Sequence, residues 1–162
     1  MVGKIARKMR DEEGFTLIEL MVVVLIIGIL IAIALPTFLG ARQRAQNRAA
    51  QSSARNALVA AKTAYTDTDS YQKATSADLV LIEPSLSYVA AGVLSTTPKM
   101  VSVWVAAAPF QEWAGAVLSD SGTCFFIHDV ATGAPGAGTF YGSDVAANCD
   151  GNHAKNAVGA SW

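Results

Sequence analysis

The side chains best able to do chemistry in this 162-residue chain are two histidines, two cysteines and a group of acids near the C-terminus. His128 alternates with Phe126 along an expected strand, and His153 lies in a polar tail. Neither histidine has a carboxylate and a nucleophile at a spacing that serves catalysis. The sequence also has no GxxxxGK segment to cradle a phosphate. We therefore expect neither an enzyme nor a cofactor.

Metal binding has one candidate region. Asp144, Asn148, Asp150 and Asn152 place oxygen-bearing side chains within nine residues, which suits a hard cation such as calcium. Asn, Asp and Gly are also the residues that turns use, and the spacing matches no familiar calcium loop. No CxxC and no cluster of His and Cys suggests zinc. The sequence predicts no metal site, with Asp144 and Asp150 as the residues to check.

The two cysteines, Cys124 and Cys149, are suited to one disulfide. If the region is exported, an even cysteine count predicts a bond that closes a loop of about 26 residues. Such a bond would contribute on the order of 3 kcal/mol through loop-closure entropy. Two buried thiols in a reducing compartment are the alternative.

Export is indicated by a long apolar run near the N-terminus. Between Phe15 and Leu39 the only polar side chains are Thr16, Glu19 and Thr37. At about 1.5 Å per residue, roughly 20 apolar residues cross a bilayer, so this run can span a membrane. Four basic residues precede it, which favours a cytoplasmic N-terminus, although two arginines follow closely on the other side.

Helix signals continue beyond the apolar run. Ala41–Tyr65 is rich in Ala, Arg, Gln and Lys and contains neither Gly nor Pro. One helix over 15–65 would be roughly 75 Å long at about 1.5 Å per residue, far more than a small domain can cover. Pro36 lacks an amide hydrogen, so we expect a kink or a freed carbonyl, with local unwinding between Gly28 and Pro36 in a polymer.

The remaining residues, 66–162, predict a small β-rich head. A short helix is expected over Ala77–Ile82 and strands over Met100–Ala107, Glu112–Ser119 and Thr123–Asp129. The last two runs flank the turn-like segment Ser119–Gly122 and should form a hairpin with a four-residue connection. Ala131–Gly138 is expected to be a flexible loop between the cysteines. The predicted fold class is α+β, with a long N-terminal helix packed on a small antiparallel sheet and one disulfide-closed C-terminal loop.

Charge is segregated along the chain, although 12 basic and 13 acidic residues give a net charge of -1. Five basic residues and no acid lie between Arg42 and Lys62, whereas from Asp67 onward nine acids face three lysines. The balanced total argues against direct nucleic-acid binding. The basic helix surface could instead meet the acidic head of another copy, although exposed ion pairs contribute only about 0–1 kcal/mol each.

The start of the apolar run is the most specific segment of the sequence. Residues 14–20, GFTLIEL, follow a short charged arm and resemble the cleavage and methylation motif of type IV prepilins. Gly28 and Pro36 also fall where pilins with short leaders often carry them. The resemblance covers about the first 65 residues and does not extend to the head.

The resemblance implies that residues 1–14 are a leader. A prepilin peptidase would cut between Gly14 and Phe15, after which Phe15 becomes the mature N-terminus and is N-methylated. Glycine before the cut leaves the backbone accessible to an active site at the membrane surface. The cut also has a physical reason, because the charged arm could not be packed into an apolar filament core.

Glu19 is the most informative single residue. An ionised carboxylate in hydrocarbon is costly unless it is paired. The resemblance implies that Glu19 neutralises the N-terminal charge of a neighbouring copy and so fixes the register of assembly. The alternative is a carboxylate that is solvated at the depth of the lipid headgroups.

Together these features predict a structural subunit that forms a homo-oligomeric type IV pilus through helix 15–65, with 15–39 as its membrane and filament-core part. The resemblance implies an inner-membrane precursor, the peptidase and the pilus assembly machinery as partners, and an extracellular pilus that serves adhesion, motility or DNA uptake. A type II secretion pseudopilin and a monomeric membrane-anchored binding domain remain alternatives. A signal peptide cut after Ala34 is disfavoured, because the apolar run exceeds the roughly 7–15 residues of such peptides.

Overall fold

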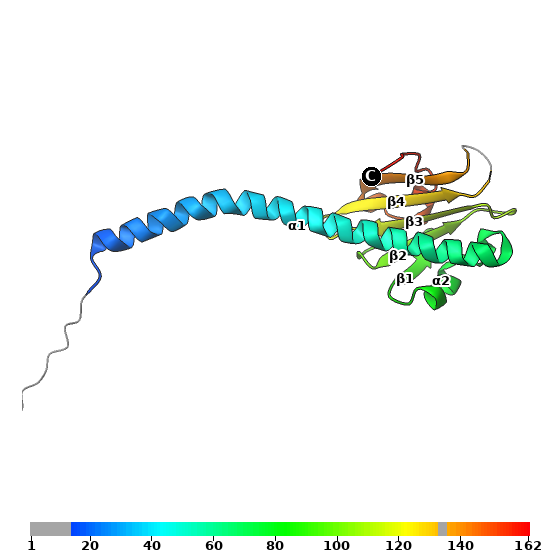
Figure 1. Ribbon diagram of the computed structural model, residues 1–162, viewed down its shortest axis with the longest axis horizontal. Coiled ribbons are helices and arrows are strands. Elements are labelled where there is room, and N and C mark those ends of the chain that lie inside the picture. The colour runs from blue at the N-terminus through cyan, green and yellow to red at the C-terminus, as the bar shows by residue number, and fades with distance from the viewer. Residues whose placement is uncertain (1–13, 133–135) are drawn as a thin grey trace, which may run out of the picture. The chain divides into compact units, whose positions relative to one another are not determined.

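The structure, a computed structural model, describes residues 14–132 and 136–162. The chain divides into two compact units, of which one ends at Gly40 and the other is Ala41–Trp162. Figure 1 shows the elements of both units. The charged arm of the expected leader, residues 1–13, lies outside the described residues, as does the centre of the loop expected over Ala131–Gly138.

One helix, α1 (Leu17–Thr68), accounts for most of the N-terminal half of the chain. The helix expected over 15–65 is confirmed, and it continues through Gly28 and Pro36 without a break in secondary structure. A single copy therefore shows no unwound segment at these two residues. The unwinding expected in a polymer stays a prediction, because it depends on contacts between copies.

The second unit, which joins the C-terminal part of α1 to the head, is built on a five-stranded sheet with the strand order β1-β2-β3-β4-β5. The strands are β1 (Ser87–Ala90), β2 (Met100–Val105), β3 (Glu112–Leu118), β4 (Thr123–Val130) and β5 (Gly138–Val145). The three strands predicted from sequence are β2, β3 and β4, each within two residues of its expected end. The four-residue connection between β3 and β4 is also confirmed, and it contains Gly122 at a φ of 87°, a conformation that favours glycine.

Two strands are not apparent from the sequence. β1 has four residues and pairs in parallel with β2, whereas the other three pairings are antiparallel. A parallel neighbour has no tight hairpin turn to mark it, so β1 leaves little trace in the sequence. β5 begins at Gly138, which was expected to lie in a loop, and Gly142 interrupts its side-chain pattern. Both are edge strands. The residue types of an edge strand are less restricted than those of a central strand, which packs between two neighbours.

Short helices complete the head. The helix expected over Ala77–Ile82 is confirmed as α2 (Ser76–Ile82), with Thr75 as its N-terminal cap. Three short elements were not expected from the sequence: the 3-10 turns η1 (Tyr71–Lys73) and η2 (Ala146–Asn148) and the four-residue helix α3 (Gly151–Ala154).

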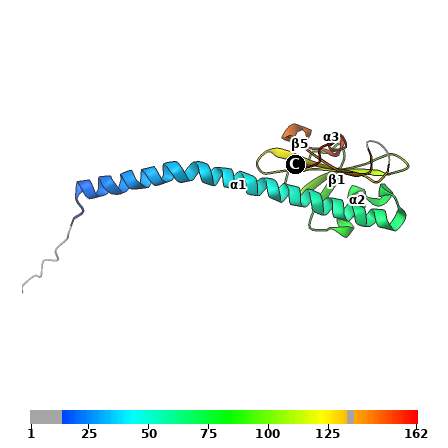
Figure 2. The same ribbon diagram turned by 45° about the horizontal axis from the view of Figure 1, so that its top comes forward.

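The sheet is covered on both faces, with α1 on one side and α3 on the other (Figure 2). The face toward α1 packs Val101, Trp113 and Ile127 against small side chains of the helix. Those helix residues are Ala50, Ala54, Ala57, Leu58, Ala60, Ala61 and Ala64. Alanine permits close approach of the helix to the sheet, and the fully buried Trp113 fills the remaining depth, with its indole N–H donated to the Ala74 carbonyl at 3.1 Å.

The opposite face is covered by the C-terminal segment around Cys149 and α3. Gly151 allows this close contact, because a Cβ there would lie 2.8 Å from the backbone nitrogen of Trp104. Its amide donates to the Ser102 hydroxyl at 3.0 Å, and that hydroxyl donates to the Ala90 carbonyl at 3.1 Å. Since both faces are covered, β4 is buried from Cys124 to Val130.

Candidate functional site

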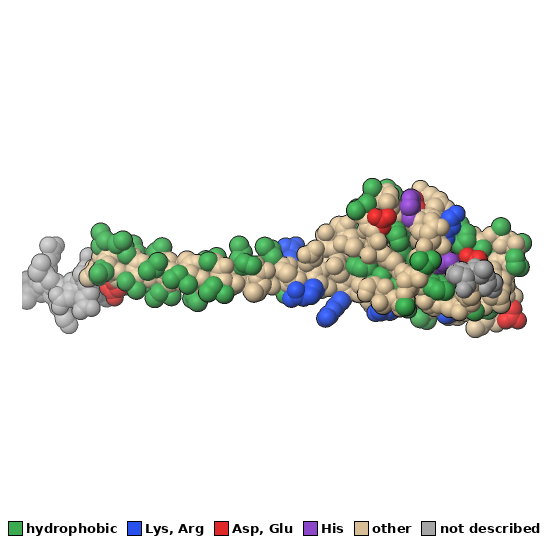
Figure 3. All heavy atoms as spheres, turned by 90° about the horizontal axis from the view of Figure 1, so that it is seen from above, with side chains coloured by type: hydrophobic (Ala, Val, Ile, Leu, Met, Phe, Trp, Pro, Cys, Tyr) green, Lys and Arg blue, Asp and Glu red, His purple; other side chains and the backbone are tan. Residues whose placement is uncertain are grey.

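The first unit presents an apolar helix surface that the described residues leave exposed. Every residue from Gly14 to Leu39 is exposed, including 18 large hydrophobic side chains that are between 49% and 86% accessible. Hydrophobic side chains follow the whole stretch in Figure 3. A single soluble protein rarely exposes an apolar patch of this extent, so lipid or other protein must cover it. Among the described helices, α1 is long and apolar enough to cross a membrane.

The N-terminus of α1 is closed by a reciprocal pair of side chains, Thr16 and Glu19. The hydroxyl of Thr16 accepts the backbone N–H of Glu19 at 3.2 Å, and it donates to the Glu19 carboxylate at 3.3 Å. A Thr three residues before a Glu is the sequence signature of a capping box, and the Thr16 half of that motif satisfies one amide that has no partner within the helix. The signature is present in GFTLIEL, but the roles expected of Glu19 were pairing in the assembly or solvation at the depth of the lipid headgroups, and not capping.

Capping leaves Glu19 able to bind a second group. An ionised carboxylate has two oxygens with about four acceptor positions, and the side chain is exposed. One oxygen of Glu19 contacts Thr16, so an ammonium group of another molecule could still approach the carboxylate. The negative charge also suits the first turn of a helix, where the helix dipole is positive.

The expected cleavage bond lies just before the helix. Gly14, Phe15 and Thr16 precede α1, and Phe15 is 86% exposed. No atom lies within 4 Å of the position that a Cβ would take at Gly14. The Gly14–Phe15 peptide is therefore outside regular structure and open to an enzyme. Gly28 is equally free of neighbours, so any packing role of Gly28 or Pro36 belongs to an assembly rather than to this single chain.

The basic stretch of α1 divides into two groups. Lys62 lies 2.8 Å from the Asp129 carboxylate of its own head, and the Arg55 guanidinium lies 4.8 Å from the ring centroid of Trp162. Arg42, Arg44 and Arg48 are exposed and make no ion pair with any residue that the structure describes. Among the described residues of this basic stretch, these three arginines are exposed and carry no ion pair, so they are open to a partner outside the chain.

Asp129 is the centre of a polar network between helix and sheet. Its carboxylate accepts hydrogen bonds at 2.5 Å from the hydroxyls of both Tyr71 and Thr139, in addition to the contact with Lys62. Burial raises the pKa of Tyr71 above its usual value, and the hydrogen bond to Asp129 and its charge raise it further. The network joins α1, η1, β4 and β5, and the sequence alone did not indicate it.

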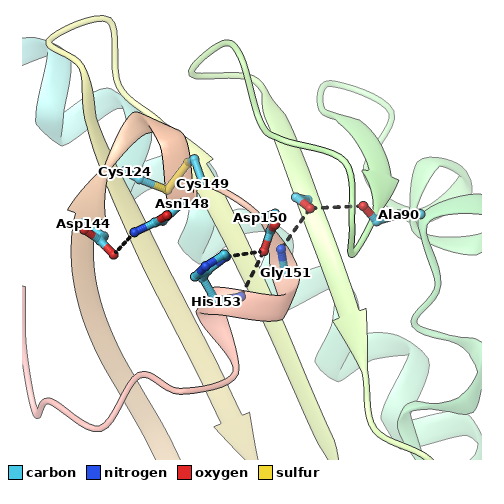
Figure 4. Close-up of polar contacts among 9 residues, drawn as sticks. Ala90, Cys124, Asp144, Asn148, Cys149, Asp150, Gly151 and His153 are labelled. Carbon is cyan, nitrogen blue, oxygen red and sulfur yellow. Dashed lines mark hydrogen bonds and ion pairs between the residues drawn. A yellow bond between two sulfur atoms is a disulfide. The ribbon is translucent and has the colours of Figure 1, made fainter.

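The disulfide between Cys124 and Cys149 is confirmed, with its Cα atoms 5.4 Å apart. It attaches the segment after β5 to β4, and both cysteines are fully buried. Figure 4 shows it beside the acids considered as cation ligands. The bond therefore acts within the head, far along the sequence from the apolar helix.

The two candidate carboxylates lie in separate hydrogen-bonded pairs, Asp144 with Asn148 and Asp150 with His153 (Figure 4). Asp144 accepts from the Asn148 amide at 2.8 Å and from the Val145 backbone, and these hydrogen bonds lower the pKa of its carboxyl. Asp150 caps α3 and contacts a ring nitrogen of His153 at 2.8 Å. Within residues 14–132 and 136–162, no group of three or more His, Cys, Asp or Glu could hold a metal ion. The acids serve turns and caps instead.

His128 has a structural environment. Its two ring nitrogens lie 3.1 Å from the Glu112 carboxylate and 3.3 Å from the Ala157 carbonyl. These contacts connect β4 to β3 and to the C-terminal segment, and the ring is 4% exposed. A buried ring held on both sides is positioned for packing rather than for contact with a substrate.

Comparison with known proteins places the resemblance in the N-terminal region. The family model described as the prokaryotic N-terminal methylation motif matches residues 9–35. The type IV major pilin protein PilA of Myxococcus xanthus is 40% identical over 68 residues, which are 42% of this chain and 31% of that protein. The type IV wide pilus major component PilA4 of Thermus thermophilus is 54% identical over 39 residues, 24% of this chain and 30% of that protein.

A secretion protein shows a similar match. The type II secretion system core protein G of Vibrio cholerae is 48% identical over 44 residues, 27% of this chain and 30% of that protein. The matched stretches span only about a third of each of these three relatives. No solved structure matches the chain. The chain thus carries the prepilin-type methylation motif, and its N-terminal region is similar to those of two type IV pilus components and of a type II secretion core protein.

Proposed function

We propose that this chain is the precursor of a type IV pilus subunit. Residues 15–39 hold it in the inner membrane, a prepilin peptidase removes residues 1–14, and α1 then polymerises into a filament on the cell surface. The observation that carries the proposal is the fully exposed apolar stretch of α1 with Glu19 in its first turn. Lipid covers this stretch in the stored subunit, and the helices of other copies cover it in the filament.

Glu19 explains why assembly has a defined register. Water is excluded from a core of packed apolar helices, so a carboxylate in that core needs a positive partner. Cleavage creates such a partner at the new amino group of Phe15. An exposed Glu19, which uses one oxygen for the Thr16 hydroxyl, can accept that ammonium from a neighbouring copy. Pairing at this one level sets the axial position of each subunit.

The role is structural rather than enzymatic. In the head, Asp150 caps α3, Asp144 accepts from Asn148, and His128 contacts Glu112. The peptidase and the inner-membrane assembly machinery are the partners that the processing and polymerisation steps require. Adhesion, motility and DNA uptake are the uses that such a filament serves.

Mass spectrometry of the purified protein, together with the protein content of sheared surface material, tests the proposal. We expect a chain that begins at Phe15, carries one added methyl group and is abundant in the sheared fraction. An intact charged arm, or a chain that begins at Leu35 after signal-peptide cleavage, would refute the processing step.

A pseudopilin of a type II secretion system is the second candidate, because the similarity to core protein G covers the same kind of segment. The two candidates differ in where the processed protein accumulates. A pilus subunit is recovered in sheared filaments, whereas loss of a pseudopilin blocks secretion while little of it appears outside the cell. Processed protein that stays monomeric and affects neither filaments nor secretion would indicate a membrane-anchored binding domain.

A further inference from the structure

We propose that Arg42, Arg44 and Arg48 form a basic collar that binds the phosphate groups of anionic phospholipids while the subunit is stored in the membrane. These three arginines are exposed and unpaired among the described residues. The inference goes beyond filament formation, because it concerns what holds the stored subunit at its depth in the membrane.

The collar lies where a helix leaves the hydrocarbon. Leu39 ends the apolar stretch, and at about 1.5 Å per residue Arg42 and Arg44 follow it by roughly 4.5 and 7.5 Å along the helix. The headgroup layer on each side of a bilayer is roughly 5–8 Å thick, so both guanidinium groups reach the level of the phosphates. Arg48 lies roughly 13.5 Å beyond Leu39, which is outside this layer, so only its long side chain can reach back toward the outer edge of the headgroups. Basic side chains are visible on the helix beyond the hydrophobic stretch in Figure 3.

The arrangement around the helix favours lipid over a protein partner. Arg44 and Arg48 are four residues apart and share one face, whereas Arg42 points to another side, because residues two apart do not face each other. An acidic surface of a second copy would contact only one side of the helix. Lipid headgroups surround a membrane helix and can reach all three arginines.

The chemistry also suits phosphate. A guanidinium presents a planar set of donors that binds phosphate oxygens in pairs. No acid lies between Glu19 and Asp67, so the collar has no neighbouring carboxylate in sequence to neutralise it. If the leader is removed as proposed above, Lys4, Arg7, Lys8 and Arg10 leave with it. The collar then supplies the basic residues that lie closest to the apolar stretch in the processed subunit.

A depth-resolved quenching experiment on the full chain tests the collar. An environment-sensitive fluorophore is attached at Ala45→Cys, between Arg44 and Arg48, and the protein is reconstituted in phosphatidylcholine vesicles with about one fifth phosphatidylglycerol. The quencher is carried on the headgroup of one lipid or of the other. We expect the labelled phosphatidylglycerol to quench several-fold more than the same fraction of labelled phosphatidylcholine, because each basic residue near the surface favours anionic lipid roughly fivefold.

Matched variants test whether the collar causes the preference for phosphatidylglycerol. Arg42→Gln with Arg44→Gln should reduce the preference to near unity, and Arg48→Gln should reduce it less, in keeping with its greater distance from the membrane. Lys73→Gln with Lys99→Gln removes the same charge from exposed lysines of the head and should leave the preference unchanged. High salt should weaken the wild-type preference, since exposed charges are screened.

Several outcomes would overturn the proposal. These are equal quenching by the two lipids in the wild type, a preference retained by the arginine double variant, or an equal loss in the lysine control. Quenching that falls as the protein-to-lipid ratio rises, with no lipid preference, would assign the collar to a second copy. The test uses unassembled protein and does not depend on leader removal, so its failure leaves the filament proposal untouched.

Discussion

The two halves of α1 use the same helix for opposite purposes. From Leu17 to Leu39 every residue is exposed, and most of the side chains are large and apolar. From Ala50 to Ala64 one face is buried against the sheet, and it consists almost entirely of alanine. The second half completes a domain within its own chain, whereas the first half is completed only by lipid or by other molecules. Folding and assembly are therefore assigned to different stretches of one element.

This division predicts that changes in the first half affect assembly and leave the head folded. The largest expected effect is that of Glu19→Gln, which keeps a side chain able to cap the helix but removes the charge that would pair with a neighbouring amine. The unpaired ammonium in the filament core costs several kcal/mol. Sheared filaments should fall by roughly a hundredfold or more, an estimate that follows from this penalty, while the processed subunit still accumulates in the membrane.

The capping role found in the structure provides the control for this experiment. Thr16→Ala removes the hydrogen bonds to Glu19 but keeps its carboxylate. It should cost about 1 kcal/mol of helix stability and reduce filaments only modestly. Wild-type filament levels for Glu19→Gln, or equal losses for both variants, would show that Glu19 matters as a cap and not as a partner in assembly.

Changes in the head should show the converse pattern, and removal of the disulfide is the strongest of them. Replacement of Cys124 and Cys149 by serine should lower the free energy of unfolding by about 3 kcal/mol, because the bond closes a loop with a sequence separation of 25 residues. Thermal unfolding followed by circular dichroism measures this loss, and membrane insertion of the precursor should not change. Reduced insertion, or unchanged head stability, would contradict the division between the two regions.

A smaller effect concerns the buried tyrosines of the head at alkaline pH. Burial raises the pKa of Tyr71, and burial followed by the charge of Glu83 raises that of Tyr88 to about 12. A group whose pKa is higher in the folded than in the unfolded state contributes stability below its unfolded pKa, about 10 for tyrosine, and loses that contribution as the pH rises further. The head should therefore lose stability above about pH 10, by at most about 1.4 kcal/mol per pH unit for each tyrosine.

Tyr71→Phe should make this alkaline decline shallower, although it is less stable at neutral pH because Asp129 loses one of its donors. Tyr141→Phe changes a tyrosine of β5 outside the Asp129 network and serves as the control. Melting curves between about pH 8 and 12 would measure the slopes. An unchanged slope in Tyr71→Phe would show that Tyr71 is not the residue that links head stability to pH.

Much of the architecture was readable in the sequence, because its signals are local. The apolar run, the alanine-rich helix, the GFTLIEL segment and the turn at Ser119–Gly122 each act through neighbouring residues. The cysteine pairing was readable for a different reason, since only two cysteines are present. The prediction that these features belong to a prepilin-type protein is supported by the motif match over residues 9–35.

What only the tertiary structure decided depends on contacts between distant parts of the chain. The edge strands β1 and β5 take their conformation from neighbours rather than from a pattern of their own. The partners of Lys62 and Arg55 lie 67 and 107 residues away, which the charge pattern could not reveal. Periodicity predicts which residues share a helix face. The packing of the sheet on that face then decides which basic residues contact the head of their own chain and which stay exposed. That packing leaves Arg42, Arg44 and Arg48 without an ion pair among the residues that the structure describes, so the basic stretch contains both residues that contact the head and residues that do not.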